Sequence, residues 1–516
     1  MKKIFTTLVA GLMISAQVMA VSTKDVCGQF TGLLNIGGDI YPNKSVYLLP
    51  GVVDSTLTFV LPDFTFGKGK LGNIVLPNIP MDENGMLHLE NATLYLDSIA
   101  ERADITILNG LEDEGTTYNS VVTATDAMVV LSIVAPSLPE PIFVLFMGAA
   151  ARANNYAFVN GGFEGDWTNS EPAGWHSFGT ATGDFNDFVL ANTDQLIQSA
   201  DVRPGSKGAH SAMLSSKMVL GAKANGNCTN GQMNAGSKTA DDPAKNYNFS
   251  DPENTGFNTP FHGHPDSLVF WAKYLPADKN PNNEVNKARM STIITTNARY
   301  QDPEATDYSA VKVASAVINY AATADLGWQR ISVPFSYTGI EGEPAYILTT
   351  FTTNMVPGGG SSYSTGGKLD KTDVLDTVYL DDAELVYNKT LSGFKIDETA
   401  LSFNKHVATV ESNYCDSCAD YIAQANGLSA QSFIAFDAAH KCAFVYVIAD
   451  DYTQSGEYNL YRVDFTDSDT KDIADPTEGF ESIRFGETRF EKVLIDGQLY
   501  IRSNDAWYNA SGVRVK

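Results

Sequence analysis

Positive charge is scarce in this sequence. Its 516 residues include 35 Lys and Arg against 61 Asp and Glu, a formal net charge of −26 at pH 7. Binding to a phosphate backbone depends on Lys and Arg, so nucleic acid is not an expected partner. The same acidity favours solubility and the capture of divalent cations outside the cell, but it identifies no ligand.

Long hydrophobic runs are missing after the first twenty residues. None approaches the ~20 apolar residues of a bilayer-spanning helix, so we expect no transmembrane segment. At the start, Met1-Lys2-Lys3 is followed by an apolar run and then by a short segment that ends in small residues before Val21. This pattern predicts a secretory signal peptide over residues 1–20. We therefore expect an exported protein, extracellular or on the cell surface, with the periplasm and outer membrane as alternatives.

Cysteine is rare and odd in number, which leaves at least one thiol unpaired in an exported chain. Cys415-x-x-Cys418 with His440-x-Cys442 resembles a zinc ligand set, although exported proteins more often oxidise such cysteines. A disulfide among these three, a zinc site and free thiols remain the alternatives. The five cysteines are Cys27, Cys228, Cys415, Cys418 and Cys442.

Motifs for catalysis are also missing. There is no Gly-x-Ser-x-Gly elbow for a nucleophile. Glycoside hydrolysis needs two facing carboxylates, ~5 to 9.5 Å apart, and the many acidic residues of the central segment stand in no motif that demands this role. His262 and His264 are either two imidazoles for a metal or a solvated loop pair. We prefer binding over cleavage and leave enzymatic activity open.

What the sequence does have is the composition of an all-β protein. It has 42 Gly, 23 Tyr and 27 Phe with only 19% charged residues, which fits short strands joined by turns. At ~150 residues per domain, the length predicts about three domains. We place them at residues 21–149, 156–388 and 389–467, with a linker at 150–155 and a tail at 468–516.

The first domain, residues 21–149, alternates apolar and polar residues in short bursts, as in 55–61, 93–96 and 128–133, separated by Gly, Pro and Asn. This period of two predicts antiparallel strands. Their order, from a leading Gly28-x-x-x-Gly32 strand to a closing strand over 141–148, resembles the calycin-like, lipocalin-related β-barrel of Bacteroidetes exported proteins. Such a barrel holds an apolar ligand or is filled by its own side chains, and we expect the filled form.

The second domain, residues 156–388, is bracketed by two motifs. Asn160-Gly161-Gly162-Phe163-Glu164 with a following Pro-x-x-Trp opens it, and a paired-aspartate strand over 379–385 closes it. With the core strand over 262–274, these motifs resemble the "putative carbohydrate metabolism domain" of Bacteroidetes, of the PCMD type. The resemblance implies a jelly-roll β-sandwich whose two ends meet. In place of His264, related sequences tend to carry Arg.

Two kinds of site are expected in this domain. If its ends meet, Glu164, Asp381 and Asp382 gather around one point, and Ca²⁺ takes six to eight such oxygens. They are therefore candidate ligands of a structural calcium, or simply a turn cap and solvated aspartates. A sugar needs aromatic rings framed by polar groups, and a loop-like segment supplies them. The candidate ligand-binding residues are Trp167, Trp175, His176, Phe185 and Asp187. The alternative for Trp175 is a place in the core.

For the third domain, residues 389–467, the sequence predicts a small Ig-like β-sandwich with strands at 408–411, 432–436, 442–449 and 459–465. In the tail, residues 490–516 carry a Gly-Gln-Leu-Tyr-Ile strand and a basic end. This ending is similar to the C-terminal sorting segments of the type IX secretion pathway, which implies outer-membrane export machinery as a partner. A plain β-hairpin is the alternative.

Together these features predict an exported carbohydrate-binding surface protein that recognises a poly- or oligosaccharide through its central jelly roll. A glycoside hydrolase acting through acidic residues of the same domain is one alternative. A structural or adhesion component of the cell surface, without a small ligand, is the other.

Overall fold

The computed structural model describes residues 21–509 except 67–68, 97–100, 114, 152–154, 169, 188–194, 220–221, 278–283, 285, 357–375, 472, 474–475, 477–489, 496–497 and 504–505. The predicted signal peptide and residues 510–516 of the predicted sorting segment lie outside this range. The described helices are single turns, α1 (Thr23–Val26), α3 (Tyr452–Ser455) and η1 (Phe178–Thr180). Strands dominate the rest, so the all-β prediction is confirmed.

The N-terminal domain is a nearly closed antiparallel barrel in the order β4-β3-β2-β1-β11-β10-β6-β5. Its interior is packed with apolar side chains from these strands, including Phe30, Phe59 and Phe146. Glycine permits one close contact, since a Cβ on Gly32 would lie 2.0 Å from the Met147 carbonyl oxygen. The strands are β1 (Gly28–Ile36), β2 (Asp39–Pro50), β3 (Thr56–Phe66), β4 (Gly69–Pro80), β5 (Leu89–Leu96), β6 (Glu101–Ile107), β10 (Asp126–Val134) and β11 (Ile142–Ala150), with β9 (Val121–Val122) beside β10 and a hairpin of β7 (Asn109–Asp113) and β8 (Thr116–Asn119).

The central domain is a β-sandwich of two five-stranded sheets whose facing sides share one core. The first sheet has the order β14 (Leu196–Ser199), β15 (Ser211–Ser215), β28 (Thr377–Val386), β21 (Ser267–Leu275), β25 (Gln329–Pro334). The second has the order β18 (Asn227–Thr229), β27 (Tyr346–Thr352), β22 (Ala288–Thr295), β24 (Lys312–Tyr320), β26 (Ser336–Tyr337). Smaller sheets are β19 (Gln232–Ala235), β20 (Asn246–Ser250) and β23 (Tyr300–Asp302), then β12 (Trp167–Thr168) with β13 (Glu171–Pro172), and β16 (Lys217–Val219) with β17 (Ala222–Ala224).

The C-terminal module also has two sheets with apolar side chains between them. One has the order β30 (Thr399–Ala400), β29 (Thr390–Ile396), β32 (Tyr421–Asn426), and the other β31 (Val407–Thr409), β35 (Asn459–Asp464), β34 (Cys442–Ile448), β33 (Gln431–Asp437). In the tail, β36 (Phe490–Ile495), β37 (Gln498–Ser503) and β38 (Ala506–Asn509) form a separate antiparallel sheet.

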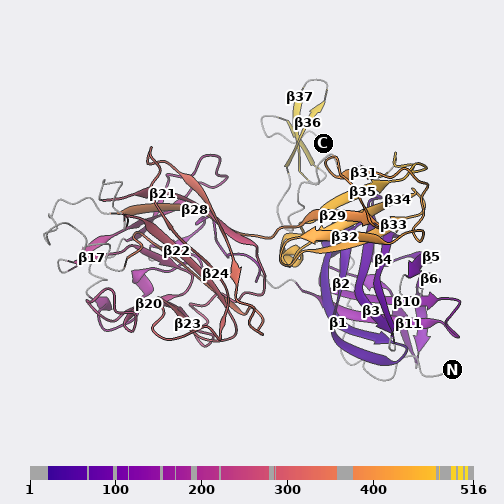
Figure 1. Cartoon of the computed structure of the whole chain (residues 1–516), viewed down its shortest axis with the longest axis horizontal. Helices are drawn as coiled ribbons and strands as arrows, with labels where there is room; N and C mark the ends of the chain where they lie inside the picture. The colour runs from indigo at the N-terminus through magenta and orange to yellow at the C-terminus, as the bar shows by residue number, and fades with distance from the viewer. Residues whose placement is uncertain are drawn as a thin grey trace.

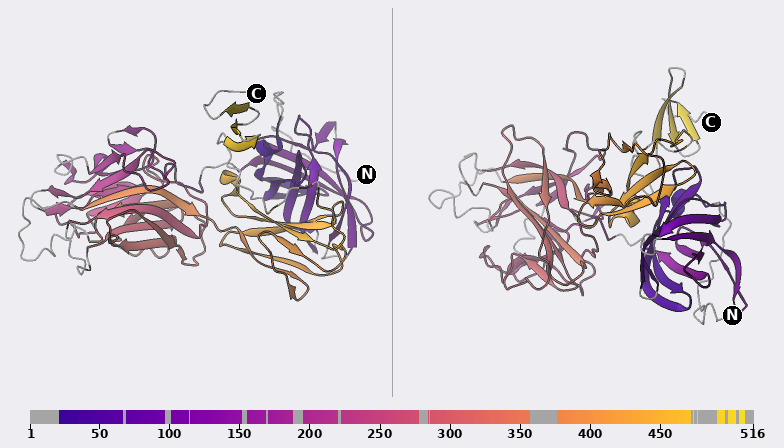
Figure 2. Two further views of the ribbon diagram at one scale, coloured as in Figure 1. Left: turned by 90° about the horizontal axis from the view of Figure 1, so that it is seen from above. Right: turned by 45° about the vertical axis from the view of Figure 1, so that its right-hand side comes forward.

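The barrel and the C-terminal module share a hydrophobic core, although they are separated in sequence by the whole central domain. Outward-facing barrel residues such as Tyr47, Leu49 and Val60 pack against Phe444 and other residues of the module. Tyr446 donates a hydrogen bond to the Pro50 carbonyl at 2.9 Å. Figures 1 and 2 accordingly show two lobes, one made by the central domain and the other by barrel and module together.

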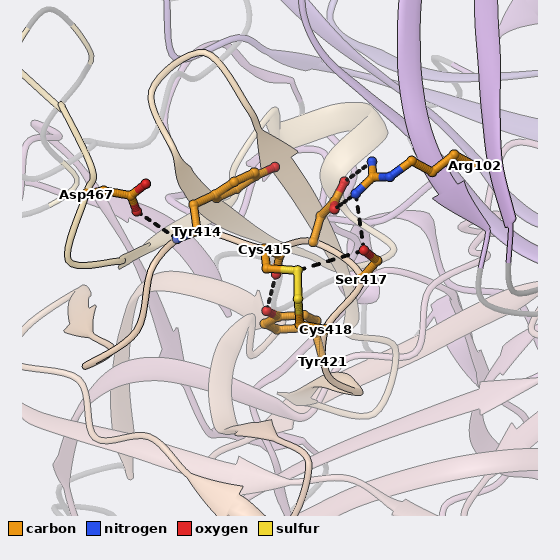
Figure 3. The surroundings of a disulfide bond; sticks show 8 residues. Arg102, Tyr414, Cys415, Ser417, Cys418, Tyr421 and Asp467 are labelled. Carbon is orange, nitrogen blue, oxygen red and sulfur yellow. Dashed lines mark hydrogen bonds and ion pairs between the residues drawn. A yellow bond between two sulfur atoms is a disulfide. The ribbon is translucent and has the colours of Figure 1, made fainter.

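The C-terminal module decides between the alternatives for the cysteines, which were a disulfide, a zinc site and free thiols. Cys415 and Cys418 form a disulfide, and the other three cysteines are buried thiols. The zinc alternative is therefore wrong, because these two sulfurs are bonded to each other and His440 instead contacts Asp437 at 2.7 Å. The disulfide loop faces the barrel, where Arg102 on β6 pairs with Asp416 and donates to Ser417 at 3.1 Å (Figure 3).

Candidate functional site

The two ends of the central domain meet, as the bracketing motifs predict. The Asn160 side chain accepts from the Glu164 amide at 2.9 Å and donates to the Glu164 carbonyl at 2.8 Å, which closes the first turn. The Ala383 amide then donates to the Gly161 carbonyl at 2.8 Å. Glycine is required at this contact, since a Cβ on Gly161 would lie 1.9 Å from the Ala383 carbonyl oxygen.

A β-bulge in β28 sets the direction of the paired aspartates. On β21, Val269 lies opposite Glu384 but Trp271 lies opposite Asp381, so β28 has one extra residue at this point. Asp382 adopts the left-handed conformation, with φ of 43°. Bulges of this kind bend a strand and redirect its side chains. Here the bulge brings both carboxylates to the loop that connects β14 to β15.

That loop supplies a donor to each of the three predicted metal ligands. The backbone amide of Arg203 donates to Asp381 at 3.0 Å, and its guanidinium pairs with Asp382 at 2.5 Å. The amide of His210 donates to Glu164 at 2.8 Å. Asp381 is fully buried, and this burial raises the pKa of its carboxyl group above the ordinary value.

These contacts bear on the predicted calcium site. Glu164 and Asp382 both lie beside Gly162, and one oxygen of Asp381 has no hydrogen-bond partner among the described residues. Yet in the described part of the chain, no three Asp, Glu, His or Cys side chains group so that they could hold a metal ion. The Arg203 guanidinium already pairs with Asp382, and the Arg203 backbone amide donates to Asp381. Calcium at this position stays a prediction.

The outer face of the first sheet, which is turned away from the core, lies beside this closure. Side chains alternate along a strand. On β21, Leu268, Phe270, Ala272 and Tyr274 are buried in the core, which places Trp271 and Lys273 on the outer face. Trp271 lies opposite Arg330 of β25, and Lys273 lies opposite Tyr379 of β28. We define the outer face by Trp271, Lys273, Trp328, Arg330 and Tyr379.

Cations lie over the aromatic rings of the outer face. The Arg203 guanidinium carbon is 5.2 Å from the centre of the Trp271 ring, and Lys273 Nζ is 5.1 Å from that of Tyr379. Trp328 meets Tyr379 edge to face, with ring centres 6.3 Å apart. Each such contact contributes about 0.5–1.5 kcal/mol. The rings are therefore held in fixed positions.

Asp201 connects two parts of the outer face. One carboxylate oxygen accepts from Lys273 at 2.7 Å, and the other accepts from the Trp328 indole at 3.1 Å. Burial by itself would raise the pKa of Asp201, but the hydrogen bonds from Lys273 and Trp328 outweigh it and hold that pKa below the ordinary value. The carboxylate is thus kept ionised and fixes the orientation of the indole.

Of the residues predicted to bind sugar, Trp175 belongs to the core. Its ring is 1% exposed and packs against Phe163 and Phe351, with ring centres 5.1 and 5.8 Å away. A ring without exposed surface cannot stack on a sugar, so its assignment as a ligand contact is corrected to the alternative, a core residue. Trp167 is half-buried against the same core, and its indole donates to the Phe163 carbonyl at 3.1 Å.

The other predicted residues lie along a different edge of the domain. His176 pairs with Thr229 as a β-bridge, and Phe185 donates its amide to the Ala235 carbonyl at 2.9 Å. Asp187 is exposed. The segment thus runs beside β18 and β19, and it does not join the outer face of the first sheet.

A buried carboxylate that sequence reasoning missed explains the position of His176. Glu171 is 6% exposed and accepts from the amide and the hydroxyl of Ser177 at 2.6 and 2.7 Å. His176 Nδ1 lies 3.3 Å from the same carboxylate, and its ring packs on Phe257 with centres 4.6 Å apart. These contacts hold the imidazole as part of the fold.

The histidine pair has separate partners. His262 Nδ1 lies 3.2 Å from the Pro344 carbonyl oxygen, whereas His264 Nδ1 lies 2.9 Å from Asp450 of the C-terminal module. The two imidazoles therefore do not converge on one metal.

Comparison with known proteins gives only distant similarity. No family model and no curated protein matches the chain. A "putative glycoside hydrolase" of Bacteroides thetaiotaomicron has 14% identity and a TM-score of 0.32, with 68% of this chain and 99% of that chain covered. For TmCBM61 in complex with β-1,4-galactotriose, the identity is 10% and the TM-score 0.21, covering 45% and 98%. For a β-1,2-glucanase of Parabacteroides distasonis, the identity is 12% and the TM-score 0.17, with 54% of this chain and 35% of that chain covered. The function must therefore be argued from the residues of this chain.

The described residues contain no helix long and apolar enough to cross a membrane.

Sequence reasoning did not select Trp271, Trp328 or Tyr379 as site residues, although it placed each of them in a predicted strand. The available signal was the alternation within 267–275, where Trp271 stands out of phase with its buried neighbours.

Proposed function

We propose that this chain is an exported carbohydrate-binding protein and that it recognises a glycan on the outer face of the first sheet of its central domain. The observation that carries the proposal is the group Trp271, Trp328 and Tyr379, three half-buried rings on one side of one sheet. Pyranose rings have apolar faces that pack on aromatic rings, while their hydroxyl groups need charged or polar partners. Arg203, Lys273 and Asp201 supply such partners at the same place.

Rigidity supports this assignment over the loop segment around Trp167. A binding site is more precise when it stands on strands and when each side chain is held by others. On the outer face, Lys273 and Trp328 are fixed by Asp201, and Arg203 is fixed by Asp382. Pre-ordered side chains lose little entropy when a ligand binds.

Binding is favoured over hydrolysis by the state of the nearby carboxylates. Asp201 and Asp382 are each paired with a cation, and Asp381 is inaccessible. A general acid must be kept protonated within reach of the glycosidic oxygen, and none of these three meets that requirement. We propose that the flanking lobe of barrel and C-terminal module presents this surface outside the cell.

The test is a glycan-binding assay on the full chain with Trp271→Ala and Trp328→Ala. We expect each to weaken binding by about tenfold or more, which corresponds to ~1.4 kcal/mol, with no release of sugar from bound oligosaccharides. Phe185→Ala is the matched control, because it removes an aromatic ring from the segment predicted first.

Three outcomes would contradict the proposal. If Phe185→Ala abolishes binding and the tryptophan variants do not, the loop segment is the site. Release of free sugar would favour the glycoside hydrolase. A failure to bind every glycan tested would favour a structural surface component.

A further inference from the structure

We propose that the outer face selects glycans that carry a carboxylate, such as those containing uronic acids, and that Arg330 recognises this group. This inference rests on the proposed function and adds the class of sugar. Its basis is the position of one cation that the fold leaves exposed beside the aromatic rings.

Arg330 lies on β25, the edge strand of the sheet, directly opposite Trp271. Side chains opposite each other in antiparallel strands have Cβ atoms ~4.5–5.5 Å apart and share one face. Arg330 is exposed. A sugar packed on the Trp271 side of this face would therefore lie within the reach of the guanidinium group.

Two other cations lie over these rings, Arg203 from the loop between β14 and β15 and Lys273 on the outer face, and both already have acidic partners. Arg203 pairs with Asp382 at 2.5 Å, and Lys273 pairs with Asp201 at 2.7 Å. Within the described part of the chain, Arg330 has neither an ion pair nor a side-chain hydrogen bond. Its planar donors match the two oxygens of a carboxylate, a geometry that an ammonium group cannot reproduce.

The net negative charge of the whole chain does not prevent recognition of an anion by Arg330. At a net charge of −26, the protein repels anions at long range. At physiological ionic strength this repulsion is screened within ~8 Å, so a short-range cation decides what binds. Arg203 and Lys273 are paired with Asp382 and Asp201, whereas Arg330 has no acidic partner in the described part of the chain. A carboxylated sugar at Trp271 would thus meet one cation that is free to pair with it.

The experiment uses the full chain and pairs of oligosaccharides that differ only in charge, such as an oligogalacturonate and its methyl ester. We expect the acidic member of a pair to bind at least about tenfold more tightly, and we expect higher salt to weaken it. Arg330→Gln should abolish this preference, and Arg330→Lys should restore part of it. Lys395→Gln, which removes an exposed charge from the C-terminal module, is the control.

The outcomes separate this inference from the proposed function. Equal binding of both members, or an unchanged preference in Arg330→Gln, overturns carboxylate recognition while loss of binding in Trp271→Ala still supports the glycan surface. If sulfated sugars are preferred over carboxylated ones, the assignment of a carboxylate is overturned as well. Unaltered melting temperatures of the variants establish that folding is intact.

Discussion

At the scale of single residues, Gly161 decides whether the central domain closes. It lies in the opening turn, and its carbonyl accepts the Ala383 amide from the last strand. The absence of a side chain lets the two backbones approach, because an added Cβ would collide with the Ala383 carbonyl oxygen at 1.9 Å. One residue thus joins parts of the chain that are far apart in sequence.

We predict that Gly161→Ala lowers the free energy of unfolding of the central domain by about 1–3 kcal/mol, the range for forced overpacking. Urea denaturation of the full chain, followed by tryptophan fluorescence, measures this change. Gly256→Ala is the matched control in the same domain, since a Cβ there would meet no atom within 4 Å. Equal stability of the two variants would show that the closure contributes little.

Arg203 is the second residue with a large role. Its amide donates to Asp381, its guanidinium pairs with Asp382, and the same guanidinium lies over the Trp271 ring. The fold therefore links the predicted metal position to the proposed sugar surface through one side chain. Chelation of divalent cations tests the calcium prediction independently of sugar binding, through the melting temperature of the protein.

At the scale of elements, the turn that precedes β21 connects the central domain to the C-terminal module. His264 donates its backbone amide to Asp450 at 3.1 Å, and its ring lies 2.9 Å from the same carboxylate oxygen. The hydrogen bond to Asp450 raises the pKa of His264. The raised pKa favours the protonated imidazole, which pairs with Asp450 across the two domains.

The sign of the pH dependence follows from this raised pKa. The ion pair stabilises the protein fully below the unfolded pKa of histidine, ~6.5, and its contribution is lost as the pH rises through the folded pKa. We predict that His264→Gln destabilises the protein by about 1 kcal/mol or less at mildly acidic pH, because the pair is partly exposed. The difference from the unmodified protein should disappear at alkaline pH.

Urea denaturation at the two pH values measures this effect. His88→Gln is the control, since His88 pairs with Asp82 within the barrel and is half exposed. A loss of stability in His264→Gln that is the same at both pH values would assign it to packing rather than to charge.

At the scale of the whole molecule, three domains in sequence form two lobes in space. The barrel and the C-terminal module bury apolar side chains against each other, and hydrogen bonds from Tyr446 and Tyr452 reach barrel carbonyls. The central domain is therefore inserted between two parts that fold together. We expect one cooperative transition for each lobe.

This arrangement predicts which of the two unfolding transitions is shifted by a substitution in each core. Phe444→Ala, in the module, should cost about 3–5 kcal/mol and lower the transition of the barrel as well, because Phe444 belongs to the shared core. Phe270→Ala is the matched variant in the central core. Hydrogen exchange of barrel amides reports one lobe, and the fluorescence of the four central tryptophans reports the other. Independent unfolding of barrel and module would contradict the insertion.

The sequence by itself determined the local structure and one long-range contact. Alternating residues and turn residues fix the strands, because side chains on one face of a strand recur with a period of two. The Asn160 turn and the paired aspartates identify the two ends that meet. Such patterns predict the all-β class, the sandwich core and the short-range disulfide alternative, since each depends on nearby residues or on a recognisable motif.

Only the tertiary structure decided which face each strand buries and what covers it. The same alternation in β21 allows either Phe270 or Trp271 to be the core residue, and burial against the second sheet selects Phe270. Trp175 becomes a core residue and Arg203 a partner of both aspartates because distant strands and loops converge on them. Packing between remote segments leaves no local pattern, which is why the shared core of barrel and module could not be read in advance.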